Sequence, residues 1–156
     1  MKVVLFNPLI PQNTGNIIRL CACTDIKLIL IGPLGFSLNN KYLKRASLDY
    51  RDLAVVEFIE NKDSFFEKYK QDDYQYAFLS TKGGKYYNQI PLCSNKENLL
   101  IFGNEDVGLP EDIYNDFSNT LYRIPMKKNI RCLNLSNAVA IVVYSLLEKS
   151  SFYGFC

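Results

Sequence analysis

Two polar loops, each of which leaves a short apolar run and enters a helix, constrain this chain more than any other feature. The first, Gly103–Pro110, follows the apolar run Leu99–Phe102, and the second, Ile124–Asn137, leads into a strongly apolar helix. A loop that enters a helix offers free backbone N–H groups, and α/β folds build ligand sites from such loops. We therefore expect the two loops to lie beside each other and to form one ligand site.

The rest of the chain alternates short apolar runs with helical periodicities. The runs that we expect to be strands are Val3–Phe6, Lys27–Ile31, Ala54–Ile59, Gln75–Ser80, Leu99–Phe102 and Thr120–Ile124. The predicted helices are one that begins at an N-cap on Thr14, Asn40–Ala46, Ser64–Gln71, one opened by Pro110, and Ser136–Glu148. This alternation favours an α/β fold, with a mainly parallel sheet and helices on both faces.

Composition narrows the class of protein further. The 156 residues are 48% apolar and contain no linker or repeat, so we expect one globular domain over residues 1–156. No apolar run reaches transmembrane length and no leader opens the chain, so we expect a cytoplasmic protein without a membrane partner. The five cysteines form no C-x-x-C pair, so we expect reduced thiols that are mostly buried.

The sequence contains no histidine. This excludes Ser-His-Asp and Cys-His nucleophile systems, histidine-ligated metals and histidine as a general base. We expect no metal, and chemistry that depends on cofactor positioning, Arg, Lys, carboxylates or the substrate itself.

The last predicted helix has almost no polar face, because apolar residues occupy nearly every position from Ala138 to Leu147. A helix that is apolar all round must be covered on every side. In a domain of this size a partner subunit is the expected cover, so we predict a homodimer; the alternative is a fully internal helix.

Each candidate loop has an ordinary explanation as well as a functional one. Gly103-x-Glu105-x-x-Gly108 is not a dinucleotide fingerprint and Gly83-Gly84-Lys85 is not a P-loop, so both can be simple turns. Glu105 can serve the electrostatics of a helix start. Arg19 can pair with a surface carboxylate, or it can bind an RNA phosphate or orient a ribose hydroxyl.

Three motifs taken together resemble a known family. They are Asn13-x-Gly15-x-x-x-Arg19, then Gly103-x-Glu105-x-x-Gly108-Leu109-Pro110, then Ile124-Pro125-Met126 continuing to Asn134-Leu135-Ser136-Asn137-Ala138-Val139. This order and spacing resemble the motifs of SpoU-type RNA 2′-O-methyltransferases of the SPOUT superfamily. The chain length and the segments Ile10–Ala22 and Leu48–Tyr50 are similar to the single-domain branch that methylates the wobble cytidine or uridine of tRNA.

The resemblance implies a fold, a cofactor and a set of site residues. The fold would carry a C-terminal trefoil knot, which general rules make very rare. The cofactor would be S-adenosylmethionine, converted to S-adenosylhomocysteine, and the positions that would contact it are Leu79, Gly103, Ile124 and Cys132. The residues that match the family's reaction centre are Arg19, Glu105 and Asn134. We expect Arg19 to position a phosphate and stabilise the developing alkoxide, because a guanidinium stays protonated.

Two positions depart from the pattern of this branch. Cys132 stands where serine is usual, so that a weaker S–H group replaces a hydroxyl. Asn104 stands where proline is usual.

The predicted partner is a tRNA anticodon loop, with leucine isoacceptors as the expected substrates. Two basic clusters could contact it: Lys41, Lys44, Arg45 and Arg51, and Lys127, Lys128 and Arg131. The alternatives are a knotted RNA-binding module that does not methylate, and an unrelated nucleotide-binding protein of flavodoxin type.

Overall fold

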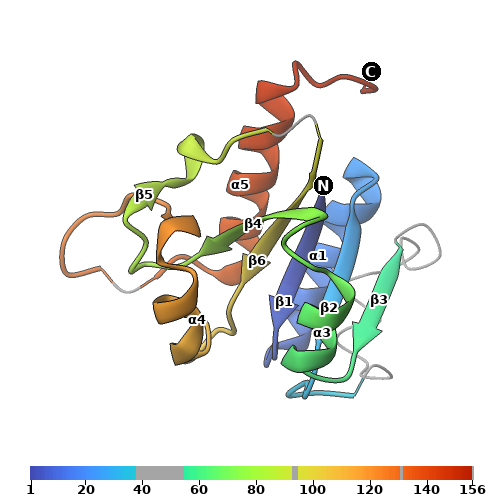
Figure 1. The fold of residues 1–156 in the computed structure, drawn as a ribbon, viewed down its shortest axis with the longest axis vertical. Coiled ribbons are helices and arrows are strands. Elements are labelled where there is room, and N and C mark those ends of the chain that lie inside the picture. The colour runs from blue at the N-terminus through green and yellow to red at the C-terminus, as the bar shows by residue number, and fades with distance from the viewer. Residues whose placement is uncertain (38–54, 93–94, 131, 156) are drawn as a thin grey trace.

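Within the described residues, seven parallel strands form a single sheet at the centre of the molecule (Figure 1). The computed structural model describes residues 1–37, 55–92, 95–130 and 132–155. The strands are β1 (Lys2–Phe6), β2 (Lys27–Ile31), β3 (Val56–Ile59), β4 (Tyr74–Leu79), β5 (Lys85–Tyr86), β6 (Glu97–Phe102) and β7 (Leu121–Arg123). Their order across the sheet is β3-β2-β1-β6-β4-β7-β5. The order differs from the 2-1-3-4-5 arrangement of flavodoxin-like sheets, so that alternative is wrong.

The central strands are apolar because they are buried on both faces. Val3, Val4 and Leu5 of β1 have no exposed surface, and β1 pairs in parallel with β2 on one side and β6 on the other. Parallel sheets covered on both faces read as continuous runs of Val, Ile and Leu rather than as alternating patterns. The predicted parallel α/β sheet is confirmed.

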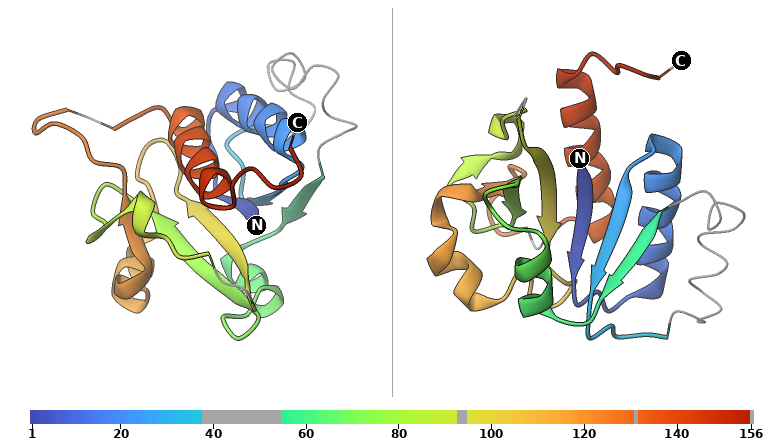
Figure 2. Two further views of the ribbon diagram at one scale, coloured as in Figure 1. Left: turned by 90° about the horizontal axis from the view of Figure 1, so that it is seen from above. Right: turned by 45° about the vertical axis from the view of Figure 1, so that its right-hand side comes forward.

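Helices cover both faces of the sheet (Figure 2). On one face α1 (Pro11–Thr24) and α5 (Leu135–Lys149) pack over a mainly aliphatic core that includes Ile17 and Val142. On the other face α3 (Lys62–Lys68) and α4 (Glu111–Asp116) lie over an aromatic core. Two short 3-10 helices, η2 (Tyr87–Gln89) and η3 (Ser118–Thr120), complete the described elements.

Most predicted elements lie where the sequence placed them, within a few residues at their ends, but α1 is an exception. Thr14 is not its N-cap: α1 begins at Pro11, and Thr14 is buried inside the helix. The short strand β5 and the helix η2 were not predicted. The predicted helix Asn40–Ala46 lies outside the described residues, as do the first basic cluster and Leu48–Tyr50.

The helix α5 is only partly covered within this single chain. Val139, Val142 and Leu146 are fully buried, whereas Ile141 is 37% and Tyr144 is 48% exposed. The alternative of a fully internal helix is therefore wrong for the isolated chain. The predicted homodimer stays a prediction. Among the described residues, no helix has the length and apolar character that a bilayer span requires.

Candidate active site

A cavity of about 410 Å³ opens at the carboxyl ends of β4, β6 and β7. Three loops surround it, namely the loops that follow these strands. Its lining consists of Ile10, Asn13, Leu79, Ser80, Thr81, Lys82, Phe102, Gly103, Asn104, Glu105, Asp106, Val107, Gly108, Tyr114, Ile124, Met126, Cys132, Leu133, Asn134, Leu135 and Ala138. Both loops line this cavity, which confirms the prediction that they lie beside each other.

Asn104 organises the first loop. Its Oδ1 accepts backbone N–H bonds from Asp106 (3.1 Å), Val107 (2.8 Å) and Gly108 (3.3 Å), while its own N–H donates to the Gly108 carbonyl (3.1 Å). Asparagine often closes turns in this way. Proline has no N–H to donate, so the asparagine at this position makes a bond that a proline could not.

Gly103 is the point of closest backbone approach in this loop. A Cβ added at Gly103 would lie 2.0 Å from the Gly108 carbonyl carbon and 2.2 Å from the Leu109 nitrogen. No side chain fits between these segments, so glycine is required to keep the loop folded back against the cavity.

Glu105 connects the first loop to the start of α1. Its Oε1 accepts from Asn13 Nδ2 (2.9 Å) and the Ile10 N–H (3.2 Å), and its Oε2 accepts from the Leu9 N–H (2.9 Å). A carboxylate beside a helix N-terminus is favourable because it meets free N–H groups and the positive end of the helix dipole. The Glu105 carboxylate thus holds the two residues that precede α1, and the helix begins at Pro11, three residues before Thr14.

The hydrogen-bond chain continues from α1 to the second loop. Asn134 Nδ2 donates to Asn13 Oδ1 (2.9 Å), and Asn134 Oδ1 accepts from the backbone N–H (2.9 Å) and the hydroxyl (2.7 Å) of Ser136. Asn134 is therefore the N-cap of α5. Glu105, Asn13 and Asn134 form one polar network, and through it three separate segments fix the shape of the cavity wall.

The loop after β4 builds the opposite wall. The Ser80 hydroxyl and the Tyr114 hydroxyl of α4 lie 3.0 Å apart in a hydrogen bond, and the Lys82 ammonium lies 4.6 Å from the centre of the Tyr114 ring. The Lys82 N–H donates to Ser80 Oγ (3.2 Å). Lys82 is thereby held at the rim, and among the described residues that line the cavity it is the only Lys or Arg.

The structure brings together most of the predicted site residues. Leu79, Gly103, Ile124 and Cys132, the predicted cofactor contacts, all line the cavity, and so do Glu105 and Asn134. Arg19 does not: it is exposed on α1, six residues beyond Asn13.

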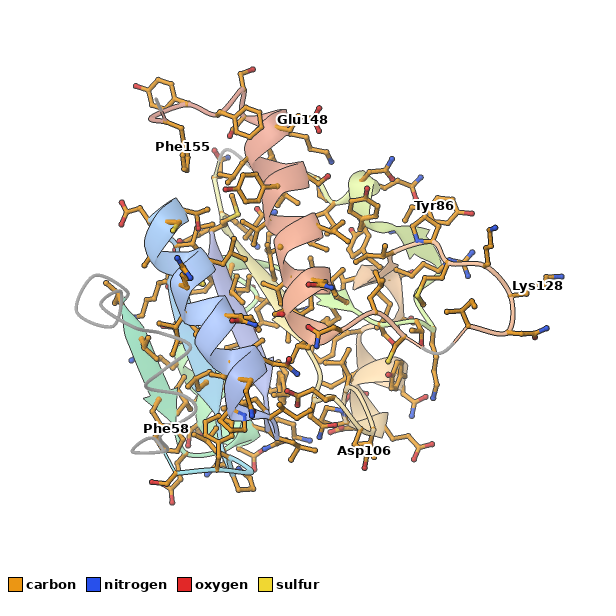
Figure 3. All side chains as sticks on the ribbon, turned by 180° about the vertical axis from the view of Figure 1, so that it is seen from behind. Phe58, Tyr86, Asp106, Lys128, Glu148 and Phe155 are labelled. Atoms are coloured by element: carbon orange, nitrogen blue, oxygen red, sulfur yellow. The ribbon has the colours of Figure 1, made fainter. Side chains whose placement is uncertain are left out.

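The predicted RNA contacts lie on a projecting loop. Lys127 and Lys128 are exposed beyond β7, and Lys128 stands at the loop tip, away from the body of the molecule (Figure 3). Arg131 lies outside the described residues.

Three polar residues at the cavity were missed as site residues. Asn13 is 5% exposed and sits at the centre of the polar network, although it was predicted only as part of a motif. An asparagine at the start of an otherwise apolar helical pattern is the sequence signal that could have identified it. Ser80 and Tyr114 carry no comparable signal, because only tertiary packing makes them neighbours.

The cavity fits an adenosyl group in size and in character. Ligand pockets usually span about 300–1,000 Å³ and combine apolar walls with a few polar groups. Leu79, Ile124 and Leu135 supply apolar walls, while the loop backbone around Gly103 supplies N–H and C=O groups. Cys132 is exposed and unpaired by any disulfide, so its thiol can serve as a weak donor. The described residues hold no cluster of three or more His, Cys, Asp or Glu suited to a metal ion.

The chain matches the model of a known protein family. The model of the SpoU rRNA Methylase family matches residues 1–144. Two relatives named tRNA (cytidine(34)-2′-O)-methyltransferase are similar over nearly their whole length. The protein of Saccharophagus degradans is 45% identical, and the match covers 98% of this chain and 97% of the relative. The protein of Yersinia pestis is 41% identical, and the match covers 99% of this chain and 96% of the relative.

Two solved structures share the fold. A structure that concerns the 2-OH methylation of C/U34 on tRNA is 34% identical, with a TM-score of 0.87 and 96% of each chain covered. An AdoMet-bound rRNA methyltransferase of Sinorhizobium meliloti is 25% identical, with a TM-score of 0.85, covering 95% of this chain and 56% of that one.

Proposed function

Because the chain belongs to the SpoU rRNA methylase family, we propose that it transfers a methyl group from S-adenosylmethionine to a ribose 2′-OH of tRNA. The observation that carries this proposal is the cavity at the ends of β4, β6 and β7, where three sequence motifs meet. The relatives named for cytidine 34 support the wobble position as the target. Within that class we propose wobble cytidine or uridine of leucine isoacceptors.

The cavity residues divide the work of binding. Leu79 and Ile124 wall the adenine, and the backbone around Gly103 contacts the nucleoside part, while Cys132 lies at the remaining wall. When bound, S-adenosylmethionine supplies a sulfonium-activated methyl group. The contribution of the protein is then alignment: a ribose 2′-OH must be held in line with that methyl group.

Glu105 and Asn134 act in this proposal as positioning residues. The Glu105 carboxylate already accepts hydrogen bonds from Leu9, Ile10 and Asn13, so it holds the loops rather than the ribose proton. Arg19 is the proposed cation for an RNA phosphate and for the alkoxide that develops on the 2′-oxygen. The proton leaves through water or the RNA phosphate.

Two further features are proposed with the function. A homodimer would cover the exposed Ile141 and Tyr144 of α5, and it would bring the exposed Arg19 of α1 into a shared RNA surface. A trefoil knot is supported by the strand order, because the late strand β7 inserts between β4 and β5, which are consecutive in the chain.

The decisive experiment is the transfer of labelled methyl from S-adenosylmethionine to tRNA that lacks 2′-O-methylation, followed by mapping of the modified nucleotide. Label on a wobble ribose is the expected result. Label on another ribose would retain the reaction and overturn the target position. A protein that binds no S-adenosylmethionine in calorimetry would overturn the proposal as a whole.

A further inference from the structure

Positive charge gathers along one edge of the sheet, where β5 pairs with β7. Residues 80–91 and 117–130 form this edge and the loops that extend from it, and they contain no Asp or Glu. Their cations are Lys82, Lys85, Arg123, Lys127 and Lys128. Since the whole chain carries a net charge of only +2, this edge is strongly basic relative to the rest of the molecule.

Three of these cations are held against tyrosine rings. Besides Lys82 on Tyr114, the Lys85 ammonium lies 5.8 Å from the centre of the Tyr122 ring and donates to the Asn119 carbonyl (2.8 Å). Cations placed over aromatic faces in this way are held in position by the ring quadrupole. The charges are thus fixed on the surface rather than carried on free side chains.

The third pair, Tyr86 and Arg123, forms a partly exposed shelf in which the guanidinium lies over the tyrosine ring. The two residues are directly opposite each other in the register of β5 and β7, and the Arg123 guanidinium lies 5.2 Å from the centre of the Tyr86 ring. Tyr86 is 46% exposed and lies at the margin of the molecule (Figure 3). Aromatic rings and guanidinium planes are the surfaces on which unstacked nucleic-acid bases stack.

The shelf is continuous with the cavity. Arg123 directly precedes Ile124, which lines the cavity, and Lys82 lies on its rim. The loop 80–84 is pressed against β7, because a Cβ at Gly83 would lie 2.4 Å from the Tyr122 carbonyl carbon and the Ser80 N–H donates to the Tyr122 carbonyl (2.9 Å). A strand of RNA with one ribose at the cavity would have a neighbouring nucleotide at this edge.

We propose that the β5–β7 edge is an RNA-docking surface, on which an unpaired base beside the methylated nucleotide stacks against the Tyr86–Arg123 shelf while Lys85 contacts a phosphate. This inference rests on the proposed function and adds residues to it that belong to none of the three sequence motifs. The partner is a single-stranded RNA loop, because bases within a duplex are already stacked.

The test measures binding of a fluorescent tRNA anticodon stem-loop, and of an RNA duplex of equal length, to the full-length protein at several salt concentrations. Tyr86→Ala is expected to raise the Kd for the stem-loop roughly 5- to 150-fold, the effect of losing one base–aromatic stack, and to leave the duplex Kd within twofold. Tyr86→Phe, which keeps the ring, is expected to restore binding. Lys85→Glu is expected to lower the slope of log K against log salt by about one unit or more.

Matched controls come from residues outside the β5–β7 edge. Phe58, on the opposite edge strand β3, is 51% exposed, and Lys96 resembles Lys85 because its ammonium also donates to a backbone carbonyl, that of Gln71 (2.7 Å). Phe58→Ala and Lys96→Glu should bind the stem-loop as the unmodified protein does. If Tyr86→Ala and Phe58→Ala bind the stem-loop with equal affinity, the proposal that a base stacks on the Tyr86–Arg123 shelf is overturned.

Two further measurements on the same preparations distinguish failure of the proposed function from failure of the docking surface. They are calorimetry with S-adenosylmethionine and methyl transfer by the unmodified protein. Absence of cofactor binding and methyl transfer in the unmodified protein would defeat the proposed function. Normal methyl transfer, with an unchanged stem-loop Kd in Tyr86→Ala, would defeat the docking surface alone.

Discussion

Polar groups have different roles at the amino ends and at the carboxyl ends of the parallel strands. At the amino ends, Glu97 pairs with Lys2 and with the N-terminal ammonium, and Glu57 pairs with Lys27 and Lys68. At the carboxyl ends, polar groups instead surround a cavity that is open to a ligand. Charges at the amino ends hold the sheet together, whereas polar groups at the carboxyl ends shape the wall of a cavity that is open to a ligand.

We infer from this contrast that separate residues carry stability and binding. Changes at the amino ends should alter the free energy of unfolding and leave binding unchanged. Changes at the carboxyl ends that leave the core intact should alter binding and leave the free energy of unfolding unchanged.

The largest effect is expected for Gly103→Ala. The added methyl group would overlap the backbone of Gly108 and Leu109, so the loop must move away from the cavity. A displacement of about 1 Å in a positioning loop can cost about 100-fold in rate, so methyl transfer should fall at least that far. Kinetics with S-adenosylmethionine and tRNA measure the loss, and calorimetry should show weaker cofactor binding.

Gly84→Ala is the matched control for this change. Gly84 lies in a neighbouring loop, and a Cβ added there would meet nothing within 4 Å. Its activity should equal that of the unmodified protein. Normal cofactor binding by Gly103→Ala would contradict the close approach as the reason for glycine at this position.

Glu105→Gln should have the next largest effect. The amide group would place a donor toward the N–H groups of Leu9 and Ile10, which are exposed, or toward Asn13, which is buried and would lose its acceptor. The loop can avoid the cost of about 1–3 kcal/mol for a buried donor without an acceptor by moving away from α1, and we expect this displacement to lower kcat/KM roughly tenfold or more. The exposed Glu67→Gln on α3 is the control, and equal activity of the two variants would show that the network does not position the site.

The parallel sheet could be predicted because each of its central strands is marked by a continuous run of apolar residues in the sequence. The runs Val3–Phe6 and Lys27–Ile31 are apolar throughout, as strands buried on both faces must be. By contrast, β5 comprises only Lys85 and Tyr86, both exposed. No pattern in the sequence marks a two-residue polar strand, and it exists only because β7, which follows 35 residues later, lies beside it.

The start of α1 shows the same limit more sharply. Local rules favour Thr14 as an N-cap, but the acceptor for the N–H groups of Leu9 and Ile10 is Glu105, which lies more than 90 positions away. The motifs placed Glu105 and Asn134 among the site residues, and both line the cavity. That Asn13 joins them follows only from the packing of α1 against the two loops.

At the amino ends, Glu57 should make stability depend on pH. Burial acts to raise its pKa, but hydrogen bonds from Lys27, Lys68 and Tyr69 outweigh burial and lower the pKa to about 2. Because the folded pKa is below the ordinary value of 4.5, the stabilisation is complete above that pH and is lost as the pH falls toward about 2.

Glu57→Gln removes this contribution. After allowance for the exposure of Lys68, we expect it to lower the free energy of unfolding by about 1–2 kcal/mol at neutral pH, and by progressively less as the pH falls through the folded pKa of about 2. Urea denaturation at several pH values measures the difference. Glu60→Gln, on the exposed loop after β3, is the control, and loss of S-adenosylmethionine affinity in Glu57→Gln would break the separation between the two ends of the strands.

The smallest effect that we expect is a change in the alkylation rate of a cysteine at the cavity, which can be measured without any mutation. Cys21 is buried in the core, which raises its pKa to about 12, so it should not react with iodoacetamide in the folded protein. Cys23 and Cys132 are exposed and should both react, but only Cys132 lines the cavity. With S-adenosylhomocysteine at ten times its Kd, alkylation of Cys132 should slow about tenfold while that of Cys23 is unchanged. Peptide mass spectrometry over time distinguishes the sites, and equal rates at Cys132 with and without ligand would place the cofactor away from this wall, because a thiol at the edge of an occupied cavity cannot remain equally accessible.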